Sequence, residues 1–175
     1  MKKIIHKYLP EFVYGSVDGV VTTVAIITGA VGAGLSSSVI FVLGIANVLA
    51  DAWSMGSSEY LSSISENQLE NNSVNGEDGN QKKPLSKGVA TFVSFVLVGL
   101  LPILPFLFSI FFDELQGIDI WLSMLCALCA FILIGYIGAQ IARVSHIKNI
   151  LRTVFVGTIA AGISFLVGYL LRGIA

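Results

Sequence analysis

Five long apolar segments constrain the fold of this chain more than any other feature of its sequence. A helix needs about 20 apolar residues to cross the hydrocarbon core of a bilayer, and each segment reaches that length. Charged residues make up only 12% of the 175-residue chain, whereas soluble domains carry about 25%. The sequence therefore predicts an all-α, polytopic membrane protein, with residues 1–175 forming one transmembrane domain. The five expected transmembrane helices cover residues 11–33, 38–61, 88–112, 119–141 and 151–171.

The connections between these segments add detail to the prediction. Only a short Gly/Ser stretch, GAGLSSS, separates the first two segments, so we expect them to form a helical hairpin. Pro102 and Pro105 remove helix hydrogen bonds and should kink the third segment. Residues 62–87 are rich in Asn, Glu and Gly and lack hydrophobic periodicity. They predict a polar cytosolic loop and not a folded domain.

The basic residues predict the orientation in the membrane. With five spans, nine of the ten Lys and Arg residues fall on one side and Arg172 falls alone on the other. Because cytosolic connections are enriched in Lys and Arg, we expect a cytosolic N-terminus. The formal net charge of −1 gives no reason to expect a nucleic-acid partner. The membrane is expected to be the cell membrane in a bacterium and a vacuolar membrane otherwise. The nine residues are Lys2, Lys3, Lys7, Lys82, Lys83, Lys87, Arg143, Lys148 and Arg152.

Acidic side chains interrupt the first two apolar segments, where no Lys or Arg accompanies them. Four polar or sulfur-containing residues recur at four-residue steps on the second segment, which places them along one helix face. Two acids lie seven residues apart on the first segment, again on one face. In an antiparallel hairpin the two faces would meet each other or a symmetry mate, which predicts a column of oxygen ligands with one sulfur. The candidate metal-binding residues are Asp18, Met55, Asp51, Glu59, Asn47 and Glu11.

An aspartate near the middle of a spanning helix costs about 2.5–3.5 kcal/mol on insertion scales. Protonation, water in a cavity or a bound cation offsets that cost, so these acids indicate a route for protons or metal ions. Oxygen ligands with a thioether fit Fe²⁺ or Mn²⁺ better than Ca²⁺ or Mg²⁺.

Each of these residues also has a purely structural interpretation. Asp18 would cap a broken helix, Met55 would fill the core, and Asp51 would hold a fixed hydrogen bond. Asn47 would link helices, and Glu11 and Glu59 would lie at the interface.

Three motifs resemble the vacuolar iron transporter family: YGSVDGVVTT in the first span, GIANVLADAWSMGSSEYLSS in the second and LVGLLPILPF in the third. The resemblance covers all five spans. It implies a homodimer whose metal path lies between the subunits, lined by the first and second helices. It also implies that cytosolic Fe²⁺, and often Mn²⁺, leaves the cytosol in exchange for protons.

The same resemblance assigns roles to individual residues. Asp18 is similar to the family's membrane acid on the first helix, Met55 to its thioether ligand, and Glu11 to an acid at the cytosolic entrance. Asn47, Asp51 and Glu59 match polar positions of the second-helix motif. Many members carry a Glu-rich metal-binding domain between the second and third helices. This chain has only residues 62–87 there, so it resembles the shorter members.

The expected function is therefore a proton-coupled transporter that moves divalent iron, manganese or both out of the cytosol. Its expected partners are divalent metal ions, protons, the lipid bilayer and a second copy of the chain. The alternative is a proton or organic-cation carrier without metal specificity. No nucleophile–His pair or phosphate-binding loop points to an enzyme, and we expect no cofactor beyond the transported ion.

Overall fold

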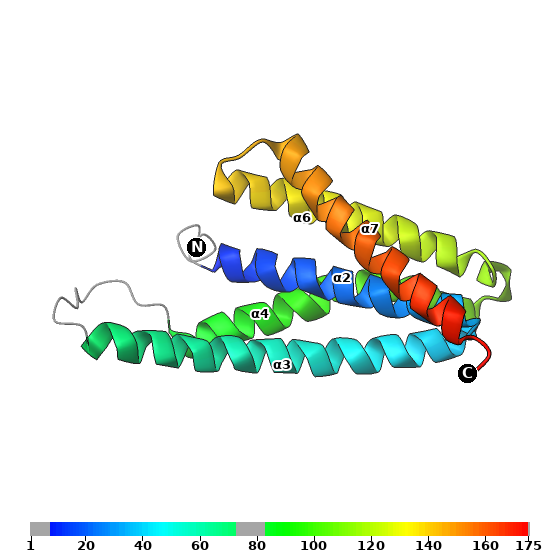
Figure 1. The fold of residues 1–175 in the computed structure, drawn as a ribbon, viewed down its shortest axis with the longest axis horizontal. Coiled ribbons are helices and arrows are strands. Elements are labelled where there is room, and N and C mark those ends of the chain that lie inside the picture. The colour runs from blue at the N-terminus through cyan, green and yellow to red at the C-terminus, as the bar shows by residue number, and fades with distance from the viewer. Residues whose placement is uncertain (1–7, 73–82, 175) are drawn as a thin grey trace.

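The computed structural model describes residues 8–72 and 83–174, and within these ranges the chain is helical without strands (Figure 1). Five stretches are long and apolar enough to cross a membrane, with α4, a short 3₁₀ turn and α5 together forming the third. The predicted all-α, multi-pass membrane fold is confirmed. The helices are α2 (Leu9–Ala33), α3 (Ser37–Asn72), α4 (Pro84–Gly99), α5 (Leu104–Phe111), α6 (Asp119–Ala142) and α7 (His146–Leu171), with 3₁₀ turns at Leu101–Ile103 and Asp113–Leu115.

The third span is broken where the prolines predicted a kink. α4 ends at Gly99, the 3₁₀ turn contains Pro102, and α5 begins at Leu104 immediately before Pro105. Proline has no N–H to donate and its ring clashes with the preceding helical turn. Two prolines three residues apart therefore divide this span into two helices.

The helix that contains the expected second span does not end at residue 61, because α3 continues to Asn72. The expected loop over residues 62–87 was therefore too long at both ends, since α4 already begins at Pro84. Residues 73–82 of that segment lie outside the described residues. The continuation is polar, and Ser and Asn outnumber the better helix formers Glu and Gln in it. An ion pair between Lys87 and Glu66 links this part of α3 to α4. Lack of hydrophobic periodicity was thus a poor guide to where the helix ends.

A tight turn joins α2 to α3, as the Gly/Ser stretch predicted. Gly34 has φ 78°, in the left-handed region that glycine adopts without strain. The backbone N–H groups of Gly34 and Leu35 donate to the carbonyls of Val31 and Ala30, each at 3.0 Å. These bonds satisfy carbonyls at the end of α2 and reverse the chain direction.

The third span completes the packing of this hairpin, because α4 contacts both α2 and α3 (Figure 1). A Cβ atom on Gly19 of α2 would lie 2.7 Å from the Phe95 carbonyl oxygen of α4. On the other side of α4, a Cβ on Gly88 would lie 2.5 Å from the Gly56 carbonyl oxygen of α3. Glycines therefore let three helix backbones approach closely.

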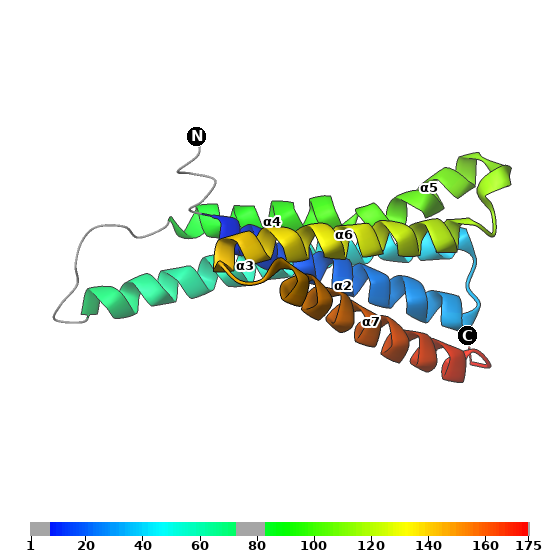
Figure 2. The ribbon, with the colours of Figure 1, turned by 90° about the horizontal axis from the view of Figure 1, so that it is seen from above.

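The core lies inside the helix bundle, and much of the remaining apolar surface faces outward. Ile27, Val48, Phe95 and Phe106 are buried in one cluster from α2, α3, α4 and α5. α7 packs against α2 and α6 on one side of the bundle (Figure 2), and its outward-facing side chains are largely apolar. An apolar outer surface is what a bilayer requires of a spanning helix.

Candidate metal pathway

The sequence-predicted residues fall into two groups at different levels of the bundle. At about 1.5 Å of rise per helical residue, Asp18 lies about 10 Å along α2 from Glu11. Asp51 lies about 12 Å along α3 from Glu59 by the same measure. Because the two helices are antiparallel, Asp18 and Asp51 form an inner group, and Glu11 and Glu59 lie nearer one end of the bundle.

The inner group contains two carboxylates that interact across the hairpin. Asp18 of α2 and Asp51 of α3 are half-buried and close enough to repel each other electrostatically. Asn47 lies one turn from Asp51 and donates its side-chain N–H to the Asp51 Oδ2 at 2.6 Å. Within the described ranges, neither carboxylate forms an ion pair with a basic side chain. A cation or proton placed between them would relieve their repulsion.

Met55 lies on α3 between the two levels and is half-buried. Its side chain packs against the cluster that contains Phe95 and Ala52, as does Met124 of α6. Met55 therefore contributes to the core. It also belongs to the α3 face that carries Asp51 and Glu59. These two roles are compatible, and they call for a control that separates packing from ligation.

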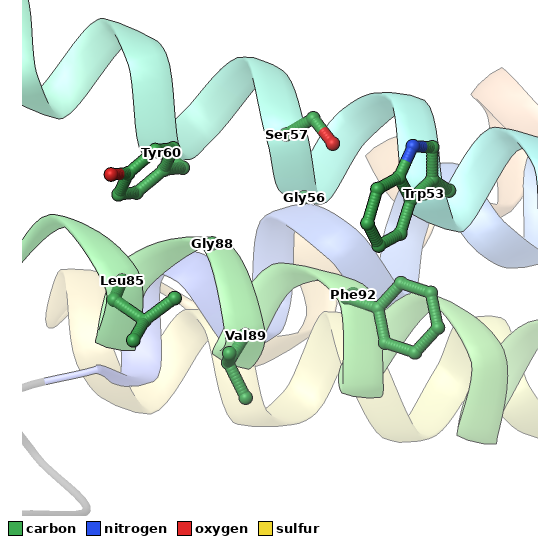
Figure 3. A pocket seen from close by; sticks show the side chains of 8 residues that line it. All are labelled: Trp53, Gly56, Ser57, Tyr60, Leu85, Gly88, Val89 and Phe92. Carbon is green, nitrogen blue, oxygen red and sulfur yellow. The ribbon is translucent and has the colours of Figure 1, made fainter.

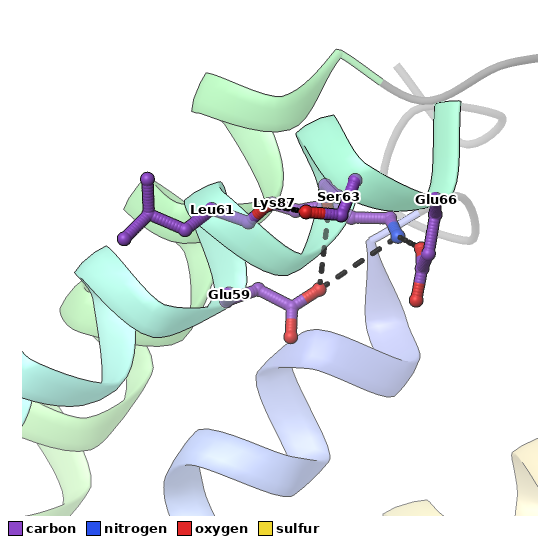
Figure 4. Close-up of polar contacts among 6 residues, drawn as sticks. Glu59, Leu61, Ser63, Glu66 and Lys87 are labelled. Carbon is purple, nitrogen blue, oxygen red and sulfur yellow. Dashed lines mark hydrogen bonds and ion pairs between the residues drawn. The ribbon is translucent and has the colours of Figure 1, made fainter. Parts of the chain in front are cut away.

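The outer group surrounds a lysine (Figure 4). The Lys87 Nζ of α4 lies 3.0 Å from the Glu66 Oε2 and 3.7 Å from the Glu59 Oε1, both on α3. Glu11 of α2, which is 8% exposed, also attracts this ammonium group. The buried Ser63 hydroxyl donates to Glu59 at 3.5 Å. Charged side chains of α2, α3 and α4 thus come together at this level of the bundle.

Sequence reasoning did not assign Lys87 or Glu66 to the site. Lys87 was used only to predict the orientation of the chain in the membrane, and Glu66 was expected to lie in a loop. Two signals point to them in retrospect. Glu59 and Glu66 are seven residues apart, so they share a face if the helix continues. Lys87 lies one turn inside a helix that begins at Pro84, where its side chain reaches toward that face.

The described residues of one copy do not group enough acidic, His or Cys side chains for a metal site. Within the described part of the chain, no three His, Cys, Asp or Glu side chains are grouped so that they could hold a metal ion together. Asp18 and Asp51 supply two carboxylates, and Asn47 supplies an amide oxygen beside them. Divalent first-row metals usually take more ligands than this pair supplies, so further ligands are needed from water or another subunit.

Two hollows among the described helices are apolar, and no acidic side chain lines either of them. A cavity of about 240 Å³ lies between α3 and α4, where Trp53, Tyr60 and Phe92 contribute aromatic walls (Figure 3). A second, of about 660 Å³, lies between α2 and α4 and is lined by Phe12, Val89 and neighbouring residues. Neither contains a carboxylate, so neither forms the ion path in a single copy.

Comparison with known proteins identifies the family. The profile of the VIT family matches residues 9–83 and 74–169, which include the first four spans and nearly all of the fifth. The chain belongs to the VIT family. The motifs that suggested this family therefore reflect a relationship along nearly the whole chain.

Several curated proteins are similar to this VIT-family chain. A vacuolar iron transporter of Toxoplasma gondii is 49% identical over 59 residues, which cover 34% of this chain and 20% of that protein. The vacuolar iron transporter of Plasmodium berghei is 24% identical over 225 aligned positions, covering 94% of this chain and 82% of the relative. Vacuolar iron transporter homolog 4 of Arabidopsis thaliana is 24% identical over 165 positions, covering 91% and 81%. The Plasmodium alignment is longer than this 175-residue chain, so it contains gaps opposite segments that this chain lacks.

Proposed function

We propose that this protein is a proton-coupled transporter that moves Fe²⁺, Mn²⁺ or both out of the cytosol. The observation that carries the proposal is the Asp18–Asp51 pair, two interacting carboxylates in spanning helices without a basic partner in the described chain. Membership of the VIT family and similarity to proteins named vacuolar iron transporter support iron as a substrate. Intramembrane acids of this kind mark ion and proton paths in general.

The candidate residues have different proposed roles at different depths in the membrane. Asp18 and Met55 coordinate the ion within the membrane, and the amide oxygen of Asn47 adds a neutral ligand. Asp51 and Glu59 complete the coordination or carry protons, and Glu11 attracts cations at the entrance. A thioether beside oxygen ligands favours first-row transition metals over Ca²⁺ and Mg²⁺.

Exchange for protons follows from the charge of the inner pair. Two carboxylates that lose a divalent ion in a low-dielectric setting are stabilised by protons, so ion release and protonation favour each other. Each elementary charge moved across 100 mV corresponds to about 2.3 kcal/mol. A pH gradient and a membrane potential can therefore both drive the exchange.

The distribution of basic residues supports a cytosolic location for the Glu11 and Lys87 end of the bundle. Metal would enter there and leave at the end that carries Arg172. The membrane is the cell membrane in a bacterial source and a vacuolar membrane otherwise. An impermeant thiol reagent added outside intact cells tests this orientation. It should label a Glu114→Cys variant and leave a Val144→Cys variant unlabelled. The reverse result would contradict the proposed orientation.

A homodimer would supply the missing ligands. One copy contributes an incomplete set of metal ligands within its described residues, and two copies facing each other through α2 and α3 would double it. Most symmetric dimers use the same surface of both subunits, which would place the two Asp18–Asp51 pairs across one axis. Cross-linking in lipid that yields only monomers would contradict the dimer.

Metal uptake into proteoliposomes under a pH gradient tests the function. We expect wild-type protein to accumulate Fe²⁺ or Mn²⁺, and Asp18→Asn and Met55→Ala each to reduce the rate by tenfold or more, about 1.4 kcal/mol. Met124→Ala is the matched control, because Met124 packs against the same core cluster as Met55. It should lose stability by a similar amount while retaining transport.

Two results would contradict this proposal. Undiminished transport by a combined Asp18→Asn and Met55→Ala variant would remove these residues from the mechanism. Proton or organic-cation flux without any metal flux would favour the alternative carrier. A parallel series with Co²⁺, Ni²⁺ and Zn²⁺ defines the metal preference.

A further inference from the structure

Lys87 is a basic side chain that the fold brings to the proposed entrance. Its Nζ lies 3.0 Å from the Glu66 Oε2 and 3.7 Å from the Glu59 Oε1, and its side chain is only 16% exposed (Figure 4). Glu11 contributes a further attraction from α2. Lys87 thus lies beside two carboxylates and is attracted by a third, and the same three charges would attract an entering cation.

The charges at this entrance are unbalanced in a way that favours a divalent ion. Three carboxylates and one ammonium group carry a formal net charge of −2. A monovalent ion that replaced the ammonium group would leave the net charge unchanged. A divalent ion that replaced it would lower the magnitude of that charge and double each Coulomb attraction at a given distance.

The Lys87 side chain can also move away from the entrance carboxylates easily. A lysine ammonium is a point charge on a flexible four-carbon stem, whereas an arginine guanidinium would hold a carboxylate through two parallel hydrogen bonds. The 3.7 Å separation from Glu59 is longer than a good charge-assisted hydrogen bond. Glu66 is 58% exposed, so water screens the shorter of the two contacts.

We propose that Lys87 is a tethered cation that holds the entrance carboxylates in the metal-free protein and is displaced by an arriving divalent ion. Lys87 thereby sets the preference for divalent over monovalent cations at the entrance. This inference rests on the proposed transport function, because it assigns a specificity-determining residue to that pathway. A purely structural Lys87 would instead anchor α4 to α3 and have no effect on ion selectivity.

Transport kinetics of Lys87→Gln test the proposal. Removing the competing ammonium group should lower the KM for Mn²⁺ about fivefold, which corresponds to roughly 1 kcal/mol of ion-pair energy. Na⁺ should inhibit Mn²⁺ uptake by Lys87→Gln at concentrations that leave the wild type unaffected. Lys83→Gln is the matched control, because exposed Lys83 precedes the same helix and its loss changes the net charge equally. A KM and Na⁺ response equal to those of Lys83→Gln would overturn the proposal.

Chemical labelling of the wild-type protein gives a second readout that does not depend on a variant folding. We expect Mn²⁺ to increase acylation of the Lys87 amine by a soluble reagent several-fold, with no change at Lys83. Unchanged or reduced labelling of Lys87 would overturn displacement. Labelling that rises with Mn²⁺ in a protein that transports no metal would support cation exchange at Lys87 and refute the proposed transport function alone.

Discussion

At the residue scale, the hydrogen bond between Asn47 and Asp51 allows two roles for that carboxylate. The 2.6 Å contact stabilises a charge inside a spanning helix, which is a structural role. The electrostatic repulsion between Asp18 and Asp51 would be relieved by a bound cation, which is a functional role. A double-mutant cycle distinguishes these roles. If Asp51 is only structural, a stable variant that lacks both Asn47 and Asp51 still transports metal; if Asp51 is functional, that variant does not.

We predict that Asn47→Leu lowers the free energy of unfolding by about 1 kcal/mol, because Asp51 then lacks its donor. Asn47→Leu combined with Asp51→Leu should recover most of that loss, since both polar groups are removed together. Thermal unfolding in detergent measures the stabilities. Metal uptake by the double variant measures the role: loss of transport in the stable protein indicates function, and retained transport would show that Asp51 is only structural.

Site residues could be predicted from sequence where the evidence lies within a single apolar segment. A carboxylate in an apolar segment, such as Asp18, stands out because its cost in lipid is large wherever the helix packs. The pairing of Lys87 with Glu66 was not predictable in the same way. It depends on α3 continuing past residue 61 and on α4 approaching α3, and neither follows from the residues themselves.

At the element scale, α4 determines how the hairpin is built. Gly15 and Gly19 lie one helical turn apart on α2, and both face the backbone of α4. Hydropathy and proline positions predicted five spans and a kink in the third, because both act within a single segment. The partner of each glycine face was not predictable, since close approach depends on surfaces from distant parts of the chain.

A single added methyl group tests this contact. We predict that Gly19→Ala lowers the free energy of unfolding by about 1–3 kcal/mol, because its Cβ would lie 2.7 Å from the Phe95 carbonyl oxygen. Gly162→Ala in α7 is the control, since no described atom beyond its own helical turn and chain neighbours lies within 4 Å of the added Cβ. That substitution should be neutral or stabilise by up to about 1 kcal/mol through helix propensity. Thermal unfolding of both purified variants measures the difference in stability. Equal stability of the two would argue against a close α2–α4 contact.

At the scale of the whole molecule, the fold presents an apolar exterior and an incomplete set of acidic ligands. The chain is a multi-pass membrane protein whose outer surface suits lipid. Its inner carboxylates lack a basic partner among the described residues. The entrance carboxylates, by contrast, have Lys87. A mobile positive ion would satisfy the inner acids in the way that Lys87 satisfies the outer ones, which is the physical basis of the proposed exchange.

Simultaneous recording of metal entry and internal pH in proteoliposomes tests this account most directly. A metal-sensitive and a pH-sensitive dye are enclosed with wild-type protein or with Asp18→Asn combined with Asp51→Asn. The account predicts that Fe²⁺ or Mn²⁺ entry and proton exit begin together in the wild type, and that both fall to the protein-free rate in the double variant. Full coupled flux in the variant, or a wild type that moves neither metal, would contradict it.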